Sequence, residues 1–284
     1  MLAFLSTPTL FKWLKLGSLM SFEYLLATGL VFLVFYVWFK KKLWYAKIQQ
    51  RYPENKHIIR EIKYSISTLF ILGIVIMLVT LANKHGLTRA YKPFDKYGYT
   101  YYFFSMVLMM FVHDTYFYWG HRLMHWKPIY KWAHQTHHLS VNPSPFAAYA
   151  FHPFEAIFEM GILPVLAFTI PHHISTLTIF ALYSLVINIG AHVGHEFFPK
   201  GVLKHKIFKW HNTATHHNLH HQAVKYNFGL YFNFWDKLMK TNHPRYEFYF
   251  NKVTDQRAKR KAALLEAAQP EQAVEIPATA LAEV

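Results

Sequence analysis

The sequence of 284 residues contains no cysteine and little negative charge, with 15 Asp and Glu against 30 Lys and Arg. The absence of cysteine excludes disulfide scaffolds, zinc–thiolate sites, iron–sulfur clusters and thiol nucleophiles. Charged residues make up 16% of the chain, below the roughly 25% of ordinary soluble domains. Hydrophobic residues reach 53%, which excludes a disordered chain. Histidine is abundant instead, with 20 residues.

Several common catalytic motifs are also missing. The chain holds no H-E-x-x-H motif of zinc proteases, no G-x-S-x-G motif of serine hydrolases and no glycine-rich phosphate loop. Nucleotide and flavin cofactors therefore have no recognisable site. The net charge of +15 could indicate nucleic acid, but no recognition fold is visible, and anionic lipid headgroups explain the clustered basic residues more simply. We expect no nucleic-acid partner.

Five apolar stretches predict a membrane protein. They lie at about residues 22–39, 65–83, 99–118, 154–171 and 174–190. The first two approach the length of about 20 apolar residues that crosses a bilayer as a helix. The last two predict a helical hairpin. The predicted fold is an all-α integral membrane protein with about four to five transmembrane or re-entrant helices.

Basic residues set the predicted orientation. Eight Lys and Arg lie between the first two stretches, in 40–63, and four lie in 84–98. The positive-inside rule places the more basic loop in the cytoplasm. Alternation then puts 119–153 and 191–284 on the same side, so we expect a cytoplasmic helical cap that is rich in histidine.

The histidines occur in groups with helical spacing, which brings side chains to one face of a helix. These groups are His121 and His125; His134, His137 and His138; His192 and His195; and His217, His220 and His221. One such pair is more often solvated than metal-bound, but two identical triplets and two pairs indicate metal, because buried imidazoles need partners. Eight to ten ligands exceed the four of a structural zinc site and fit two metal ions.

These motifs resemble the fatty acid hydroxylase superfamily, and within it the sterol desaturase branch of the C-5 sterol desaturase type. The matching runs, over about residues 100–245, are HDTYFYWGHRLMH (113–125), HQTHH (134–138), AFHPFE (150–155), HVGHE (192–196), HHNLHH (216–221) and YNFGLYFNFWDKLMKT (226–241). The resemblance implies a membrane-bound non-haem di-iron oxygenase. Such an enzyme uses O2 and two external electrons to hydroxylate or desaturate an unactivated C–H position of a lipid, sterol-like or fatty acyl.

The resemblance implies that two iron ions are held by His121, His125, His134, His137, His138, His217, His220 and His221, with His192 and His195 as further candidates. The HVGH spacing is shorter than the H-x-x-x-H of related hydroxylases, so the choice between the last two stays open. His152 and His216 stay open as well. Asp114, Glu196 and Asp236 are candidates for orienting imidazoles through their second ring nitrogen.

The chain divides into three expected parts. Residues 1–98 hold an amphipathic segment, at 1–19, and two transmembrane helices; residues 99–250 form the catalytic domain; residues 251–284 form a cytoplasmic tail, helical and then disordered. No electron-carrier motif is recognisable, so a separate donor of the ferredoxin or cytochrome b5 type, with its reductase, is expected. The end of the chain carries no retrieval signal, which favours a bacterial inner membrane over the endoplasmic reticulum.

Two other functions remain open. The same histidines could belong to a membrane metal transporter or to a non-catalytic metal or lipid sensor. Transport ligands are expected inside the spans near the bilayer midplane, whereas these histidines cluster at span ends. Identical motifs also leave the substrate and the choice between hydroxylation and desaturation open.

Overall fold

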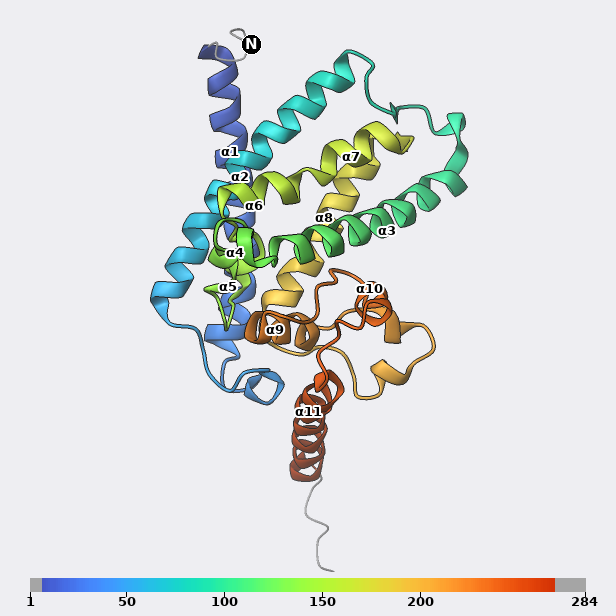
Figure 1. Cartoon of the computed structure of the whole chain (residues 1–284). Helices are drawn as coiled ribbons and strands as arrows, with labels where there is room; N and C mark the ends of the chain where they lie inside the picture. The colour runs from blue at the N-terminus through green and yellow to red at the C-terminus, as the bar shows by residue number, and fades with distance from the viewer. Residues whose placement is uncertain (1–6, 269–284) are drawn as a thin grey trace, which may run out of the picture.

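A computed structural model describes residues 7–268, which are mostly helical (Figure 1). Within this range three helices are long and apolar enough to cross a membrane. They are α1, Thr7–Phe32, continued by the π-helical turns Leu33–Trp38; α2, Asn55–Lys84; and α8, Ile174–His192. The all-α expectation is confirmed in the main, and three of the expected four to five transmembrane or re-entrant helices are candidate spans in the described residues.

The remaining predicted stretches fold differently for physical reasons. Residues 99–118 lie in α3, Gly98–Met124, which buries polar side chains such as His113 and Asp114 along its length. Residues 154–171 are divided at Gly161 into α6, Pro153–Met160, and α7, Ile162–Thr169, of eight residues each. Eight residues rise only about 12 Å, less than half of the roughly 30 Å of hydrocarbon.

Near both limits of the described range, segments that were expected to be separate belong to long helices. Residues 7–19, expected to form a separate amphipathic segment, are the first turns of α1. Residues 251–268 of the expected tail belong to α11, Tyr246–Ala268. The predicted disordered end lies outside the described residues.

One small sheet departs from the all-α expectation. Strand β1, Ala90–Tyr91, pairs in parallel with β2, His172–His173, with Ala90 opposite His172. The sheet ties the loop after α2 to the start of α8. It therefore lies about 28 Å along α8 from His192, because α8 has 19 residues.

Short helices carry six of the 20 histidines. The short α-helices are α4, Lys127–Ala133; α5, Gln135–His138; α9, Ala214–Ala223; and α10, Phe234–Leu238. The 3-10 turns are η3, Trp44–Ala46; η4, Phe94–Lys96; η5, Pro145–Tyr149; η6, Val202–Lys204; and η7, Phe208–Trp210. In Figure 1, α4, α5 and α9 gather at one end of α8, with α10 and α11 beyond them.

We call α5, α9 and the histidines around them the histidine-rich cap. Each candidate span has one end beside it. Phe35, near the end of α1, packs against His195 with ring centroids 5.2 Å apart. Arg60, near the start of α2, donates a hydrogen bond of 3.1 Å to Ser140, two residues after α5. Helix α8 ends at His192 itself. The histidines thus collect at one end of the bundle.

Close packing of α3 against α6 can be tested at Gly120. A Cβ atom there would lie 2.0 Å from Cζ of Phe158, whose ring is stacked on Tyr116 with centroids 4.9 Å apart. We expect Gly120→Ala to lower the free energy of unfolding by about 1–3 kcal/mol through overpacking. Thermal unfolding in detergent would show this as a lower Tm.

Gly190 offers a matched control, because it is also helical but has no atom within 4 Å of its Cβ position. Gly190→Ala should leave Tm unchanged or raise it slightly, since alanine favours helix over glycine. Equal shifts in the two variants would contradict the tight α3–α6 contact.

Candidate metal centre

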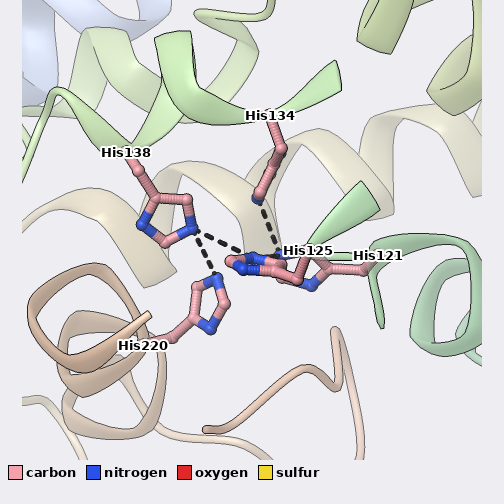
Figure 2. A group of neighbouring side chains, drawn as sticks. All are labelled: His121, His125, His134, His138 and His220. Atoms are coloured by element: carbon pink, nitrogen blue, oxygen red, sulfur yellow. Dashed lines mark hydrogen bonds between the residues drawn. The ribbon is translucent and has the colours of Figure 1, made fainter. Parts of the chain in front are cut away.

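Nine histidines form two adjacent groups. The five-histidine group consists of His121, His125, His134, His138 and His220 (Figure 2). The four-histidine group consists of His137, His192, His217 and His221. Within each group, one ring nitrogen of every residue lies within 4.8 Å of the others. The structure therefore brings together nine of the ten histidines that the sequence indicated.

The two groups share their supporting helices. His137 and His138 are neighbours on α5, and His220 and His221 are neighbours on α9, yet each pair is divided between the groups. Consecutive residues of an α-helix project about 100° apart, so one helix can serve two centres. The rings of His138 and His221 lie with centroids 5.2 Å apart, which places the groups side by side.

The Nε2 atoms converge at distances that suit a metal ion. In the five-histidine group, Nε2 of His121 lies 2.9 Å from Nε2 of His134, and the same atoms of His138 and His220 are 2.9 Å apart. In the four-histidine group, Nε2 of His192 lies 3.0 Å from that of His217. Ligands about 2.1 Å from one ion lie about 3.0–3.4 Å from each other. Each group therefore fits one metal ion.

Hydrogen bonds to the backbone orient three of these rings. Nδ1 of His121 lies 2.9 Å from the carbonyl oxygen of Phe228, Nδ1 of His220 lies 2.6 Å from that of Tyr226, and Nδ1 of His192 lies 2.7 Å from that of Asn188. A carbonyl only accepts, so each Nδ1 carries the proton. The lone pair of each Nε2 is then free for a metal ion.

Burial keeps the rings neutral. Removal from water, with neighbouring rings as a smaller cause, lowers the pKa of His138 to about 3. The same causes lower the pKa values of His217 and His220 well below the usual range. Neutral imidazole is the form that binds metal, so no proton has to be displaced at pH 7.

Glu155 orients a further ring. Its Oε1 lies 2.5 Å from Nδ1 of His134, and both side chains are buried. A carboxylate at this position fixes the ring and makes its other nitrogen a stronger ligand. Pro153 starts α6, with His152 as its N-cap, and so sets Glu155 in the first turn. The run HPFE, residues 152–155, is the feature of the sequence that indicates this helix start and the position of Glu155.

Asp236 and Asp114 hold a loop in place and do not contact the grouped rings. Asp236 accepts hydrogen bonds from the amides of Phe228, at 2.9 Å, and Gly229, at 2.8 Å. Asp114 accepts from the amide of Tyr231, at 2.8 Å. Because this loop, residues 226–232, supplies the carbonyls that orient His121 and His220, the two carboxylates act on these rings through the backbone.

Glu196 also binds backbone in place of an imidazole. Its Oε2 accepts from the amide and the hydroxyl of Thr215, at 2.9 and 2.6 Å, at the start of α9. His195 lies outside both groups, because Gly194, with φ of 68°, turns the chain after α8. The ring of His195 packs against Phe35, and its Nδ1 lies 2.9 Å from the carbonyl oxygen of Val193.

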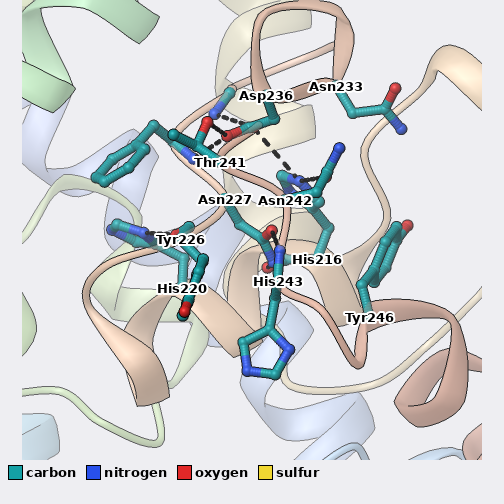
Figure 3. A network of polar contacts seen from close by, with 12 residues as sticks. His216, His220, Tyr226, Asn227, Asn233, Asp236, Thr241, Asn242, His243 and Tyr246 are labelled. Atoms are coloured by element: carbon teal, nitrogen blue, oxygen red, sulfur yellow. Dashed lines mark hydrogen bonds and ion pairs between the residues drawn. The ribbon is translucent and has the colours of Figure 1, made fainter. Parts of the chain in front are cut away.

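Two histidines that the sequence left open also take other roles. His152 caps α6, where its Nδ1 accepts from the amide of Phe154. His216 lies between Asp236 and Asn242, with its Nε2 3.5 Å from Oδ2 of Asp236 (Figure 3). Of the four open candidates, only His192 joins a metal group.

A mostly apolar cavity of about 150 Å³ lies beside both groups. Three of its lining residues contact grouped histidines. The ring of Phe117 lies 4.9 Å from that of His121, the ring of Phe151 lies 5.3 Å from that of His137, and the carbonyl of Asn188 binds His192. Only a single layer of side chains, such as Phe117 and Phe151, would separate a molecule in this cavity from each histidine group.

The sequence model of the family described as Fatty acid hydroxylase matches residues 106–241. This range contains all nine grouped histidines and Glu155. The chain is 30% identical to a Delta(7)-sterol 5(6)-desaturase of Aspergillus fumigatus over 220 residues, 72% of this chain and 67% of the relative. The chain belongs to the fatty acid hydroxylase superfamily and is sterol desaturase-like. The resemblance of its motifs is thereby confirmed.

Other members of the superfamily are similarly distant. Lathosterol oxidase of Homo sapiens is 29% identical over 182 residues, 63% of this chain and 59% of the relative. The C-4 methylsterol oxidase of Schizosaccharomyces pombe is 32% identical over 169 residues, 57% of this chain and 52% of the relative. The match to human, rat and mouse lathosterol oxidase spans about three fifths of their length. No solved structure matches the chain.

These relatives come from three mammals and two fungi. They give no support to the expected bacterial inner membrane. The membrane character itself agrees with the three apolar helices.

Glu155 can be tested through metal affinity. We expect Glu155→Gln to weaken metal binding about 10- to 100-fold, because the ring of His134 loses its charged partner. Competition with a chelator would measure the change. Glu54→Gln is the matched control, since Glu54 is exposed and pairs with the exposed Lys56. Equal affinities of the two variants would contradict the role of Glu155.

Asp236 should affect one group more than the other. Its loop orients two rings of the five-histidine group, whereas His192 of the four-histidine group is held by α8 itself. We expect Asp236→Asn to lower metal content from about two ions per chain toward one. Asp255→Asn, at an exposed ion pair with Lys200, is the control. Full retention of metal, or loss of both ions, would count against this division.

Proposed function

We propose that the protein is a membrane-bound non-haem di-iron oxygenase that hydroxylates or desaturates an unactivated C–H position of a lipid, with a sterol as the first candidate. The observation that carries the proposal is the pair of adjacent histidine groups beside an apolar cavity. The relatives named above are sterol oxidases and desaturases, which supports this choice of substrate.

Each histidine group would hold one iron ion. The donor set fits, because nine neutral imidazoles are suitable iron ligands and the chain has no thiolate to offer. Iron in these groups supplies the capacity to activate O2 with two external electrons. Glu155 and the carbonyls of the 226–232 loop keep the rings in the orientation that this requires.

The cavity would hold the substrate. Its walls include Leu72, Phe117 and Leu163, which exclude water and give an inert lipid an apolar site. The contacts of Phe117 and Phe151 with grouped histidines would place the reacting carbon close to the metal ions. The remaining specificity depends on which part of the lipid lies at that point.

The histidine-rich cap would face the cytoplasm. The basic loop at 40–63 joins α1 to α2 at the same end of the bundle as the histidines. Its exposed lysines, Lys40, Lys41 and Lys42, would lie close to the membrane surface. A separate electron donor with an acidic surface, of the ferredoxin or cytochrome b5 type with its reductase, would dock on this side.

Metal content and product formation test the proposal together. The protein would be purified in mild detergent from iron-replete cells without chelators. We expect about two iron ions per chain, because each histidine group completes one site. His220→Ala and His221→Ala, neighbours that face different groups, should each lower occupancy by about one ion and abolish O2-dependent lipid oxidation. His85→Ala, at an exposed position after α2, is the control.

The alternatives give different results in the same assays. Well-folded protein with one metal ion or none would contradict the di-iron proposal and favour a sensor. Unchanged oxidation in both alanine variants would exclude these sites as catalytic. Metal flux into proteoliposomes, without oxidation of any lipid, would indicate a transporter.

A further inference from the structure

The cavity beside the metal groups continues toward the far end of the bundle. A second hollow of about 350 Å³ shares Ile76, Leu163 and Ala181 with it and reaches His172 in β2. The two hollows together fall within the range of about 300–1,000 Å³ that is usual for small-molecule sites. An elongated lipid could thus lie along α8 with one end at the metal groups.

Glu159 is an unusual member of the cavity wall. Its side chain is 7% exposed, and it lines the cavity near Tyr149, whose ring is stacked on Tyr24. Within residues 7–268 no hydrogen bond or ion pair ends on the Glu159 carboxyl group. A buried carboxyl group without a partner is costly. Its position in the wall indicates that a bound molecule supplies the partner.

Glu155, one turn earlier in α6, differs from Glu159 in its partner. Glu155 lies four residues earlier, and its Oε1 pairs with Nδ1 of His134. The Cα atoms of the two residues are about 6 Å apart along the helix axis, and only Glu159 lines the cavity. No metal-site role is left for Glu159, since it contacts none of the grouped rings.

We propose that Glu159 binds the hydroxyl group of a neutral lipid and thereby selects hydroxylated substrates. This inference rests on the proposed oxygenase function and adds the residue that recognises the substrate. Burial raises the pKa of Glu159 to about 8, so its carboxyl group is largely neutral at pH 7, and a hydroxyl can both donate to it and accept from it. A hydroxyl also costs little to desolvate, whereas a free fatty acid, a phosphate or an ammonium would bring a charge into an apolar cavity at a higher desolvation cost.

The position of Glu159 also bears on where oxidation occurs. Glu155 contacts a ring of the five-histidine group, so Glu159 lies on the order of 10 Å from that centre. A lipid anchored at Glu159 presents carbons close to its hydroxyl group to the metal ions. The oxidised carbon therefore belongs to the hydroxyl-bearing end of the molecule and not to the remote end of a long chain.

Equilibrium binding to the detergent-purified, iron-loaded full chain tests the proposal. The probes are a radiolabelled Δ7 sterol with a free 3-hydroxyl group and the same hydrocarbon without it. Glu159→Leu should weaken binding of the hydroxylated sterol about 10- to 100-fold and leave the deoxy compound within about threefold. Glu159→Gln keeps a hydrogen-bonding group and should stay within about threefold of wild type. Glu247→Leu, at an exposed glutamate in the first turn of α11, is the matched control.

Three outcomes would overturn the proposal. These are equal affinity of the wild type for both probes, equal weakening of both probes by Glu159→Leu, and tighter binding of a 3-amino sterol than of the alcohol. Metal content separates this inference from the oxygenase proposal, because Glu159→Leu should retain both ions. Iron and turnover without hydroxyl selectivity would reject only the role of Glu159, whereas selective binding without iron would reject only the oxygenase.

Discussion

The burial of nine imidazole rings in one place is the constraint on which the structure depends. Rings this close cannot all be protonated, and burial lowers their pKa values so that they stay neutral. In a neutral ring whose Nε2 faces the metal site, Nδ1 carries the proton and needs a hydrogen-bond acceptor. The carbonyls of Phe228, Tyr226 and Asn188 meet this need for three of the rings. Three elements therefore supply the acceptors that hold the rings: the end of α8, the 226–232 loop and α6.

Four carboxylates support this arrangement. Asp114 and Asp236 come from different helices, yet both bind amides of the 226–232 loop. Glu196 fixes the start of α9, which carries three of the grouped histidines, and of these four carboxylates only Glu155 contacts a grouped ring directly. Most of the negative charge near the site thus acts on the backbone, where a buried carboxylate is stabilised by amide donors. This use of charge leaves the metal ligands themselves uncharged.

The sequence was sufficient for the family, and nine of the ten histidines that it indicated lie in the two groups. Spacing of four residues brings together His121 with His125 and His217 with His221, because residues four apart share one face of a helix. The sequence was insufficient for contacts between distant segments. The partner of Asp114 lies 117 residues away, and no local pattern distinguishes an amide from an imidazole as its target. His195 was expected at the site because the HVGH spacing assumes a continuing helix, whereas the positive φ of Gly194 ends it. The division of 154–171 at Gly161 was not expected, because hydropathy along this stretch does not show it.

Helix α6 joins the metal centre to the cavity. Its eight residues between His152 and Gly161 carry Glu155 in the first turn and Glu159 near the end. One of them satisfies His134 and the other is left for a bound molecule. The close contact of Phe158 with Gly120 locks α6 against α3, which also supplies His121. Substrate position and ring orientation are therefore mechanically linked, so a change that displaces α6 should disturb both at once.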